Sequence, residues 1–238
     1  MFGSFLTVVA HRVPRGESVV VGRSMCPTCG HQIAAYDNVP ILSWVTLRGR
    51  SRCCSKPISA RYPLTEVALA ALFSGVLLRF HGDLGEIAGG LVFCATLLVI
   101  TLTDLERRII PNRVLIVSAT LGFAIFAISD PSSLPERLGC ALGAGGVLFV
   151  AALAYPGGMG MGDVKLASVM GLFLGVEVIP ALLIGLLAGS IVGIAMIVRE
   201  GASARKKAIP FGPFLALGGF AALFAGHALI QLYLRLLT

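Results

Sequence analysis

The sequence predicts an all-α polytopic membrane protein of about eight transmembrane segments, the first of them truncated, with one small cytoplasmic loop domain. Of the 238 residues, 56% are apolar and only 13% are charged, and the mean hydropathy is +0.90. A soluble domain carries about 25% charged residues, so this chain lacks the polar side chains to coat a water-exposed globule. The same composition excludes a disordered chain, a collagen and a coiled coil. Long apolar runs, separated by short polar breaks, supply the membrane segments.

Residues 1–10 form the first apolar stretch. This stretch is too short to cross a bilayer of about 30 Å, so we interpret it as a truncated first membrane helix or as the end of a helix that starts upstream. It lacks the basic n-region and the small-residue cleavage site of a secretory signal. The polar block 11–62 follows, and its cysteines, glycines, prolines and basic residues indicate a loop domain.

The remaining residues, 63–238, predict a membrane domain of about seven helices. The apolar runs lie at 63–79, 86–103, 113–129, 137–155, 164–175, 177–198 and 212–236. The run 164–175 is short for a membrane span and directly follows the glycine-rich break 156–162. This pattern is typical of a half-buried or tilted helix.

The basic residues fix the expected orientation. If the segments alternate across the membrane, 16 of the 19 lysines and arginines fall on one side, and eight of these lie in the block 11–62. Cytoplasmic loops carry such an excess, so the loop domain is predicted to be cytoplasmic. The net charge of +7 is then mainly a topology signal. We expect the lipid bilayer as a partner and no nucleic acid, because no basic helix carries interleaved aromatic residues.

Two carboxylates stand out from the other acidic residues. Asp104 directly follows the apolar run 91–103, and Asp163 opens the run after the glycine-rich break, so both are predicted at the cytoplasmic edge of the membrane. Acidic residues at a membrane are costly and usually functional. Gly160 and Gly162 allow a neighbouring helix or a substrate strand to approach closely. If the two carboxyl groups meet, they can share one proton, so that one activates water and the other protonates a leaving amine.

Three other interpretations remain open. In the simplest, Asp104 ends a helix and pairs with Arg107 or Arg108, while Asp163 only caps the next helix. Paired membrane carboxylates also relay protons, as in a proton-coupled transporter, although a transporter normally shows repeat symmetry and acids near the midplane. A non-catalytic membrane scaffold would need neither carboxylate.

Seven blocks of the sequence together resemble a known family. They are 3–14, 26–31, 36–44, 57–66, Asp104 with 110–112, the Gly-Met-Gly-Asp run 160–163, and the Pro-Phe-Gly-Pro run 210–213. In this order and at these separations they resemble the prepilin peptidases, or type IV leader peptidases, which are membrane aspartyl proteases of the GxGD kind. A single GxGD motif would be weak support, but the seven blocks span nearly the whole chain.

The resemblance implies an activity and a location. Asp104 and Asp163 would be the catalytic pair, with Gly160 and Gly162 as supporting residues, and proteolysis would need no cofactor. The substrates would be type IV prepilins and pilin-like precursors of type II secretion, cut behind a short basic leader at the cytoplasmic face of the bacterial inner membrane. Many members also N-methylate the new N-terminus with S-adenosylmethionine, an activity linked to the cytoplasmic block.

The cysteines of the loop domain depart from the family pattern. The resemblance implies two C-x2-C pairs about twenty-one residues apart, but here Ser51 stands in the third position and Cys53 is displaced. The candidate zinc ligands are Cys26, Cys29, Cys54 and Cys53, with His31 as an alternative to Cys53. Structural zinc needs four tetrahedral ligands, and adjacent cysteines are not expected to serve one ion easily. We therefore expect either a weak zinc site or four reduced cytoplasmic thiols, and methylation is tied to the same question.

Overall fold

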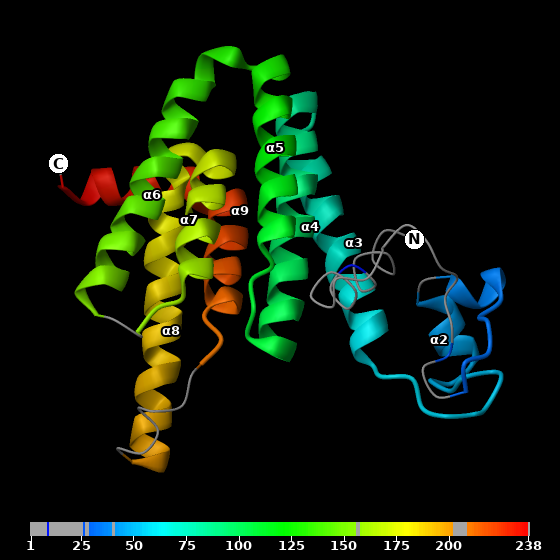
Figure 1. The fold of residues 1–238 in the computed structure, drawn as a ribbon. Helices are drawn as coiled ribbons and strands as arrows, with labels where there is room; N and C mark the ends of the chain where they lie inside the picture. The colour runs from blue at the N-terminus through cyan, green and yellow to red at the C-terminus, as the bar shows by residue number, and fades with distance from the viewer. Residues whose placement is uncertain are drawn as a thin grey trace. The chain divides into compact units, whose positions relative to one another are not determined.

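The computed structural model describes Val9, Cys26 and residues 29–39, 41–155, 158–201 and 209–237. The chain divides into two compact units, Met1–Ser74 and Gly75–Thr238. The first predicted membrane segment, 1–10, lies outside the described residues apart from Val9. Figure 1 shows the course of the chain.

The described part of the first unit is a small loop structure that leads into a helix. It contains the 3-10 turn η2 (Ala35–Asn38), the short helix α2 (Leu42–Thr46) and the start of α3 (Arg61–Arg79). Two side chains hold these pieces together. Trp44 Nε1 donates to the carbonyl of Ile58 at 3.1 Å, and Glu66 accepts from the backbone N–H of Ile41 at 2.8 Å. Glu66 therefore anchors the start of α2, where Ile41 has a φ of 61°.

The second unit is a bundle of helices. Its members are α4 (Leu84–Arg107), α5 (Asn112–Ser129), α6 (Leu134–Ala154), α7 (Met161–Leu174), α8 (Val178–Glu200) and α9 (Gly212–Leu237), with the 3-10 turns η3 (Pro131–Ser133) and η4 (Gly175–Glu177). Together with α3 they confirm the seven helices that the apolar runs predict from residue 63 onward. In Figure 1 the helices of this unit run alternately up and down.

The described residues contain six stretches that are long and apolar enough to cross a membrane. The fifth, Met161–Glu200, joins α7, η4 and α8. Within it, α7 has 14 residues and is about 21 Å long, too short to cross a bilayer alone. The expectation of a short helix after the glycine-rich break is therefore confirmed, but most of α7 is buried and not half-buried as expected.

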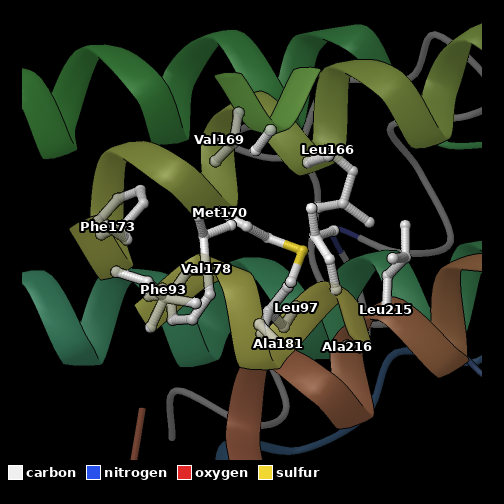
Figure 2. Packing of buried hydrophobic residues seen from close by; sticks show 14 of the residues in the cluster. Phe93, Leu97, Leu166, Val169, Met170, Phe173, Val178, Ala181, Leu215 and Ala216 are labelled. Carbon is white, nitrogen blue, oxygen red and sulfur yellow. The ribbon is translucent and has the colours of Figure 1, made fainter. Parts of the chain in front are cut away.

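Helix α7 lies at the centre of the bundle. It packs against α6, α5 and α9, and Leu166, Ala167 and Met170 are fully buried. Figure 2 shows Met170 reaching toward Leu97 of α4. By contrast, α8 leaves a row of large apolar side chains exposed: Ile179, Leu183, Leu187, Ile191, Ile194 and Val198. A surface of this kind is suited to lipid, so the protein is an integral membrane protein.

Candidate active site

Asp104 lies in the last turn of α4 and is buried, with 5% of its surface exposed. Its Oδ2 accepts a hydrogen bond of 2.8 Å from the backbone N–H of Gly212, the first residue of α9. The first N–H groups of a helix have no partner within the helix. The carboxylate of Asp104 thus supplies the partner that the start of α9 requires, and it fixes this helix end beside α4.

Asp163 is the third residue of α7 and is also buried, with 8% of its surface exposed. Its Oδ2 accepts from the backbone N–H of Gly160, the N-cap residue, at 3.2 Å. This is the reciprocal half of a capping box, and a carboxylate is stabilised at a helix N-terminus. The helix-capping role considered from the sequence is therefore present in the structure, and it leaves the second carboxyl oxygen of Asp163 out of this bond.

Two helix ends bring the two carboxyl groups near each other. Asp104 comes from the end of α4, Asp163 from the start of α7, and their carboxyl groups are close enough to interact electrostatically. Among the described residues, neither carboxylate forms a close ion pair. The charge of Arg108 still acts on Asp104, so the pairing with Arg108 that one interpretation of the sequence expected is present only as a longer-range electrostatic interaction. Two buried carboxyl groups whose charges interact are a candidate acid–base pair.

The glycines of the Gly-Met-Gly-Asp run permit close packing. A Cβ at Gly162 would lie 3.0 Å from the Cβ of Ile110, in the loop that follows α4. A Cβ at Gly160 would lie 3.2 Å from Oδ2 of Asp163. The start of α5, directly after this loop, is joined to the start of α7 by a hydrogen bond of 3.0 Å from Lys165 Nζ to Asn112 Oδ1. These contacts hold the two segments that carry the aspartates side by side.

Gly212 is the site residue that the sequence did not single out. The only indication was the Pro-Phe-Gly-Pro run 210–213, which is typical of a turn at the start of a helix. In the structure a Cβ at Gly212 would lie 2.8 Å from Oδ2 of Asp104. Only glycine leaves space for the carboxylate to reach the backbone N–H here.

The first unit holds a separate cluster of thiols. The Sγ atoms of Cys26, Cys29, Cys53 and Cys54 all lie within 4.8 Å of one another. Cys26 and Cys54 are 3.7 Å apart, and Cys29 and Cys53 are 3.2 Å apart. In a zinc–thiolate tetrahedron with bonds of about 2.3 Å, the sulfur atoms are about 3.8 Å apart. The four thiols therefore fit one zinc ion, and the expected difficulty with adjacent cysteines is not seen.

The turn around Ser51 explains why adjacent cysteines fit. Ser51 Oγ lies 2.9 Å from the sulfur of Cys53 and 3.5 Å from that of Cys54, so its hydroxyl bonds to the cluster where the family pattern has a thiol. The pKa of the Cys54 thiol is lowered by its hydrogen bonds with Ser51 and the backbone of Lys56. His31 contributes no ring nitrogen to the cluster, so the fourth candidate ligand in the structure is Cys53.

An ion pair links this cluster to the turn η2. Arg52 donates from Nε and Nη2 to the two carboxyl oxygens of Asp37, at distances between 2.9 and 3.2 Å. Its guanidinium carbon also lies 5.5 Å from the centre of the Tyr36 ring. The hydrogen bonds and charge of Asp37 raise the pKa of Arg52. These contacts fix Arg52, the residue before Cys53 and Cys54, against η2.

Comparison with known proteins identifies the family. Residues 91–198 match the model of the Type IV leader peptidase family, and residues 1–80 match that of the Bacterial Peptidase A24 N-terminal domain. A protein from Aeromonas hydrophila named prepilin leader peptidase/N-methyltransferase is 34% identical over 98% of this chain and 90% of its own length. The chain belongs to the type IV leader peptidase family.

Two other relatives support the same family assignment. Relatives with the same name in Bacillus subtilis (strain 168) and Burkholderia pseudomallei (strain 1026b) are 34% and 35% identical. The alignments cover 99% and 94% of this chain and 95% and 82% of those proteins. No solved structure matches the chain significantly. The resemblance inferred from the seven sequence blocks is confirmed.

Proposed function

We propose that this type IV leader peptidase is an aspartyl endopeptidase of the bacterial inner membrane. Its substrates would be type IV prepilins and pilin-like precursors of type II secretion, from which it removes the short basic leader at the cytoplasmic face. The observation that carries the proposal is the pair of buried carboxyl groups, Asp104 and Asp163, each held by a backbone N–H at a helix end. The names of the relatives support the same activity.

The proposed reaction uses the two carboxyl groups and one water molecule. One carboxylate takes a proton from water while the water oxygen attacks the carbonyl carbon of the scissile peptide bond. The other carboxyl group gives its proton to the amide nitrogen as the C–N bond breaks. The pair ends with one proton, as it began, and the products are the leader carboxylate and a new N-terminal amine. We assign the roles to the pair and not to either residue alone.

The orientation follows from the basic residues near the same helix ends. Arg108, Arg113 and Lys165 lie near the helix ends that carry the aspartates. Arg137 lies near the start of α6, at the other end of the bundle from the aspartates. Cytoplasmic ends of membrane helices are enriched in such residues. This supports a cytoplasmic active site and a cytoplasmic loop domain, in agreement with cleavage behind a leader that has not crossed the membrane.

The position of the carboxyl groups favours a peptidase over a proton-coupled transporter. Transporter sites lie near the membrane midplane, between structural repeats. Here Asp104 lies in the last turn of α4 and Asp163 in the first turn of α7, so both are near helix ends. A site at the membrane edge can meet an extended leader from the cytoplasm.

We further propose that the four thiols hold a structural zinc ion and that the chain also N-methylates its product. Cys26, Cys29, Cys53 and Cys54 would be the ligands, and the ion would tie two separate segments of the loop domain together. The methyl donor would be S-adenosylmethionine, which would supply an electrophilic methyl group to the new amine and leave as S-adenosylhomocysteine. The relatives' names include this second activity.

The test is to co-express the protein with a candidate prepilin and to measure the mass of the pilin product. Asp104→Asn and Asp163→Asn should each lower cleavage by about 10²–10⁴-fold, since a positioned acid or base contributes about that much. Asp130→Asn is the matched control, because Asp130 lies in an exposed loop at the opposite helix ends and should leave cleavage unchanged. Normal cleavage by both active-site variants would contradict the proposal. A mass increment of one methylene on the product would support methylation.

A further inference from the structure

A partly buried ion pair lies in the second unit, away from the aspartates. Arg137 is in the second turn of α6, and its side chain is only 11% exposed. Its Nη2 donates to Glu86, in the first turn of α4, and its Nη1 donates to the backbone carbonyl of Phe173 at 2.7 Å. Its guanidinium carbon lies 3.7 Å from the centre of the Phe126 ring on α5. One side chain thus joins four helices.

The bond to Phe173 is the contact that bears on α7. Phe173 lies in the last turn of α7, where backbone carbonyls have no partner within the helix. A guanidinium has five donors in a rigid fork, so Arg137 can bind this carbonyl and Glu86 at the same time. A charged group in a membrane helix is costly and is retained mainly for function. In this bundle it fixes the end of α7 opposite to Asp163.

An aromatic contact sets the same register between α4 and α7. The ring of Phe173 stacks on that of Phe93 of α4, with centres 5.2 Å apart, and Figure 2 shows the two rings beside each other. From Phe93 to Asp104 along α4, and from Phe173 back to Asp163 along α7, the helices rise by about 16 Å and about 15 Å. Because these lengths match, holding Phe173 at the level of Phe93 brings the two carboxyl groups to the same depth.

We propose that Arg137 is a positioning residue that sets the depth of α7 and thereby places Asp163 opposite Asp104. The proposal rests on the proposed function, in which these two aspartates act together. Arg137 itself lies at the far end of α7 and takes no part in the reaction. What matters is its bond to the Phe173 carbonyl, and the ion pair with Glu86 orients the guanidinium for that bond.

Variants can separate the bond from Arg137 to Glu86 from its bond to Phe173. Glu86→Gln removes the ion pair and leaves the donor to Phe173, so we expect less than about a threefold loss of kcat. Arg137→Met removes both of these bonds and also the bond of 3.1 Å from Nε to Ser133 Oγ, and we expect kcat to fall by about 100-fold with KM little changed, because small misplacements of reacting groups cost about that much. Arg137→Lys keeps one charge that can bind the carbonyl, and it should recover part of the loss.

The exchanged pair, Glu86→Arg with Arg137→Glu, is the sharpest variant. It restores an ion pair between α4 and α6 and should restore thermal stability in detergent. It leaves the Phe173 carbonyl without the donor on α6, so kcat should remain low. A purely structural ion pair predicts the opposite, with activity returning together with stability.

The position of α7 can be measured without activity. Lys165 Nζ and Asn112 Oδ1 are 3.0 Å apart at the starts of α7 and α5. In a chain with Asn112→Cys and Lys165→Cys, a short bismaleimide should therefore join the two positions, with the linked peptides identified by mass spectrometry. Arg137→Met should reduce this cross-link by at least about threefold, whereas Glu86→Gln should not. If Arg137→Met does not fold, Arg137→Lys and the exchanged pair carry the same comparison.

The experiments distinguish failure of the positioning role of Arg137 from failure of the proposed function. Loss of activity in step with stability for all variants, or an unchanged cross-link in Arg137→Met, would overturn the positioning role. If Asp104→Asn and Asp163→Asn cleave normally while the cross-link still responds to Arg137→Met, the proposed function fails but the control of α7 depth by Arg137 stands.

Discussion

At the scale of single residues, the contact between Gly212 and Asp104 shows how a backbone group can position a carboxylate. The hydrogen bond of 2.8 Å between them is buried and joins residues 108 positions apart. Asp163 depends on a local bond instead, from the N-cap Gly160 three residues earlier. The two carboxyl groups are therefore fixed differently, one by the capping of its own helix and the other by the start of a distant helix.

The first prediction concerns this contact. Gly212→Ala should lower peptidase activity by about 10–100-fold, because the new Cβ would lie 2.8 Å from Oδ2 of Asp104 and would displace the carboxylate from its place. Gly146→Ala on α6 is the control, since no atom lies within 4 Å of the added Cβ. Initial rates on a prepilin substrate in proteoliposomes, compared with circular dichroism of the same samples, would test it. Full activity of Gly212→Ala would show that the close contact is dispensable.

At the scale of helices, glycines allow α6 and α7 to pack backbone against backbone. A Cβ at Gly171 of α7 would lie 2.5 Å from the carbonyl oxygen of Cys140 and 2.6 Å from Cα of Ala141, both on α6. Small residues at such interfaces are how membrane helices gain close packing, because lipid provides no hydrophobic drive for their association. A buried hydrogen bond of 2.8 Å from Thr96 to Ser118 joins α4 and α5 in addition.

The second prediction tests the packing of α6 on α7. Gly171→Ala should lower the free energy of unfolding by about 1–3 kcal/mol, because overpacking against backbone cannot be relieved by a side-chain rotation. Gly143→Ala, with no atom within 4 Å of its added Cβ, should be neutral or stabilising by about 0.5–1 kcal/mol through helix propensity. Denaturant titrations of both variants in detergent would decide the matter. If Gly171→Ala and Gly143→Ala had equal free energies of unfolding, α6 would be able to move away from α7 at little cost in free energy.

At the scale of the whole molecule, the chain consists of two compact units with different means of stabilisation. The second unit has a buried apolar cluster that includes Phe93, Leu97 and Met170. In the described part of the first unit most large apolar side chains of α2 and its neighbours are exposed, such as Leu42 and Val45. Small domains with little core need metals or disulfides, and no disulfide joins the six cysteines, all of which lie in described parts of the chain.

The third prediction uses the only tryptophan of the chain. Removal of zinc with a chelator should shift the emission of Trp44 to longer wavelength, because its ring packs on Gly49 and its N–H bonds to Ile58, on either side of the turn that carries Cys53 and Cys54. The purified protein should contain about one zinc per chain, and Cys53→Ser should lower that content. Cys94→Ala, in the core of α4, is the control and should retain the metal. Unchanged zinc content in Cys53→Ser would exclude Cys53 as a ligand.

Much of the membrane architecture follows from local sequence properties. The apolar runs predicted the seven helices α3 to α9, since burial in lipid requires long apolar segments whose backbone groups are satisfied within the helix. The helix ends differ by a few residues, because caps such as Asp83, which accepts from the N–H of Glu86, add turns that hydropathy does not register. Asp104, for example, is within α4 and not after it, since the helix continues to Arg107.

Contacts between residues far apart in the chain could not be predicted from the sequence, for a physical reason. Nothing local indicates that Gly212 meets Asp104, that Arg137 binds the end of α7, or that the displaced Cys53 reaches the other three thiols, because each contact depends on how separate segments pack. Composition, charge distribution and the spacing of short motifs determined the membrane fold class and pointed to Asp104 and Asp163. Only the tertiary structure decided which backbone groups hold the carboxylates and at what depth, since those distances arise from side-chain packing between helices.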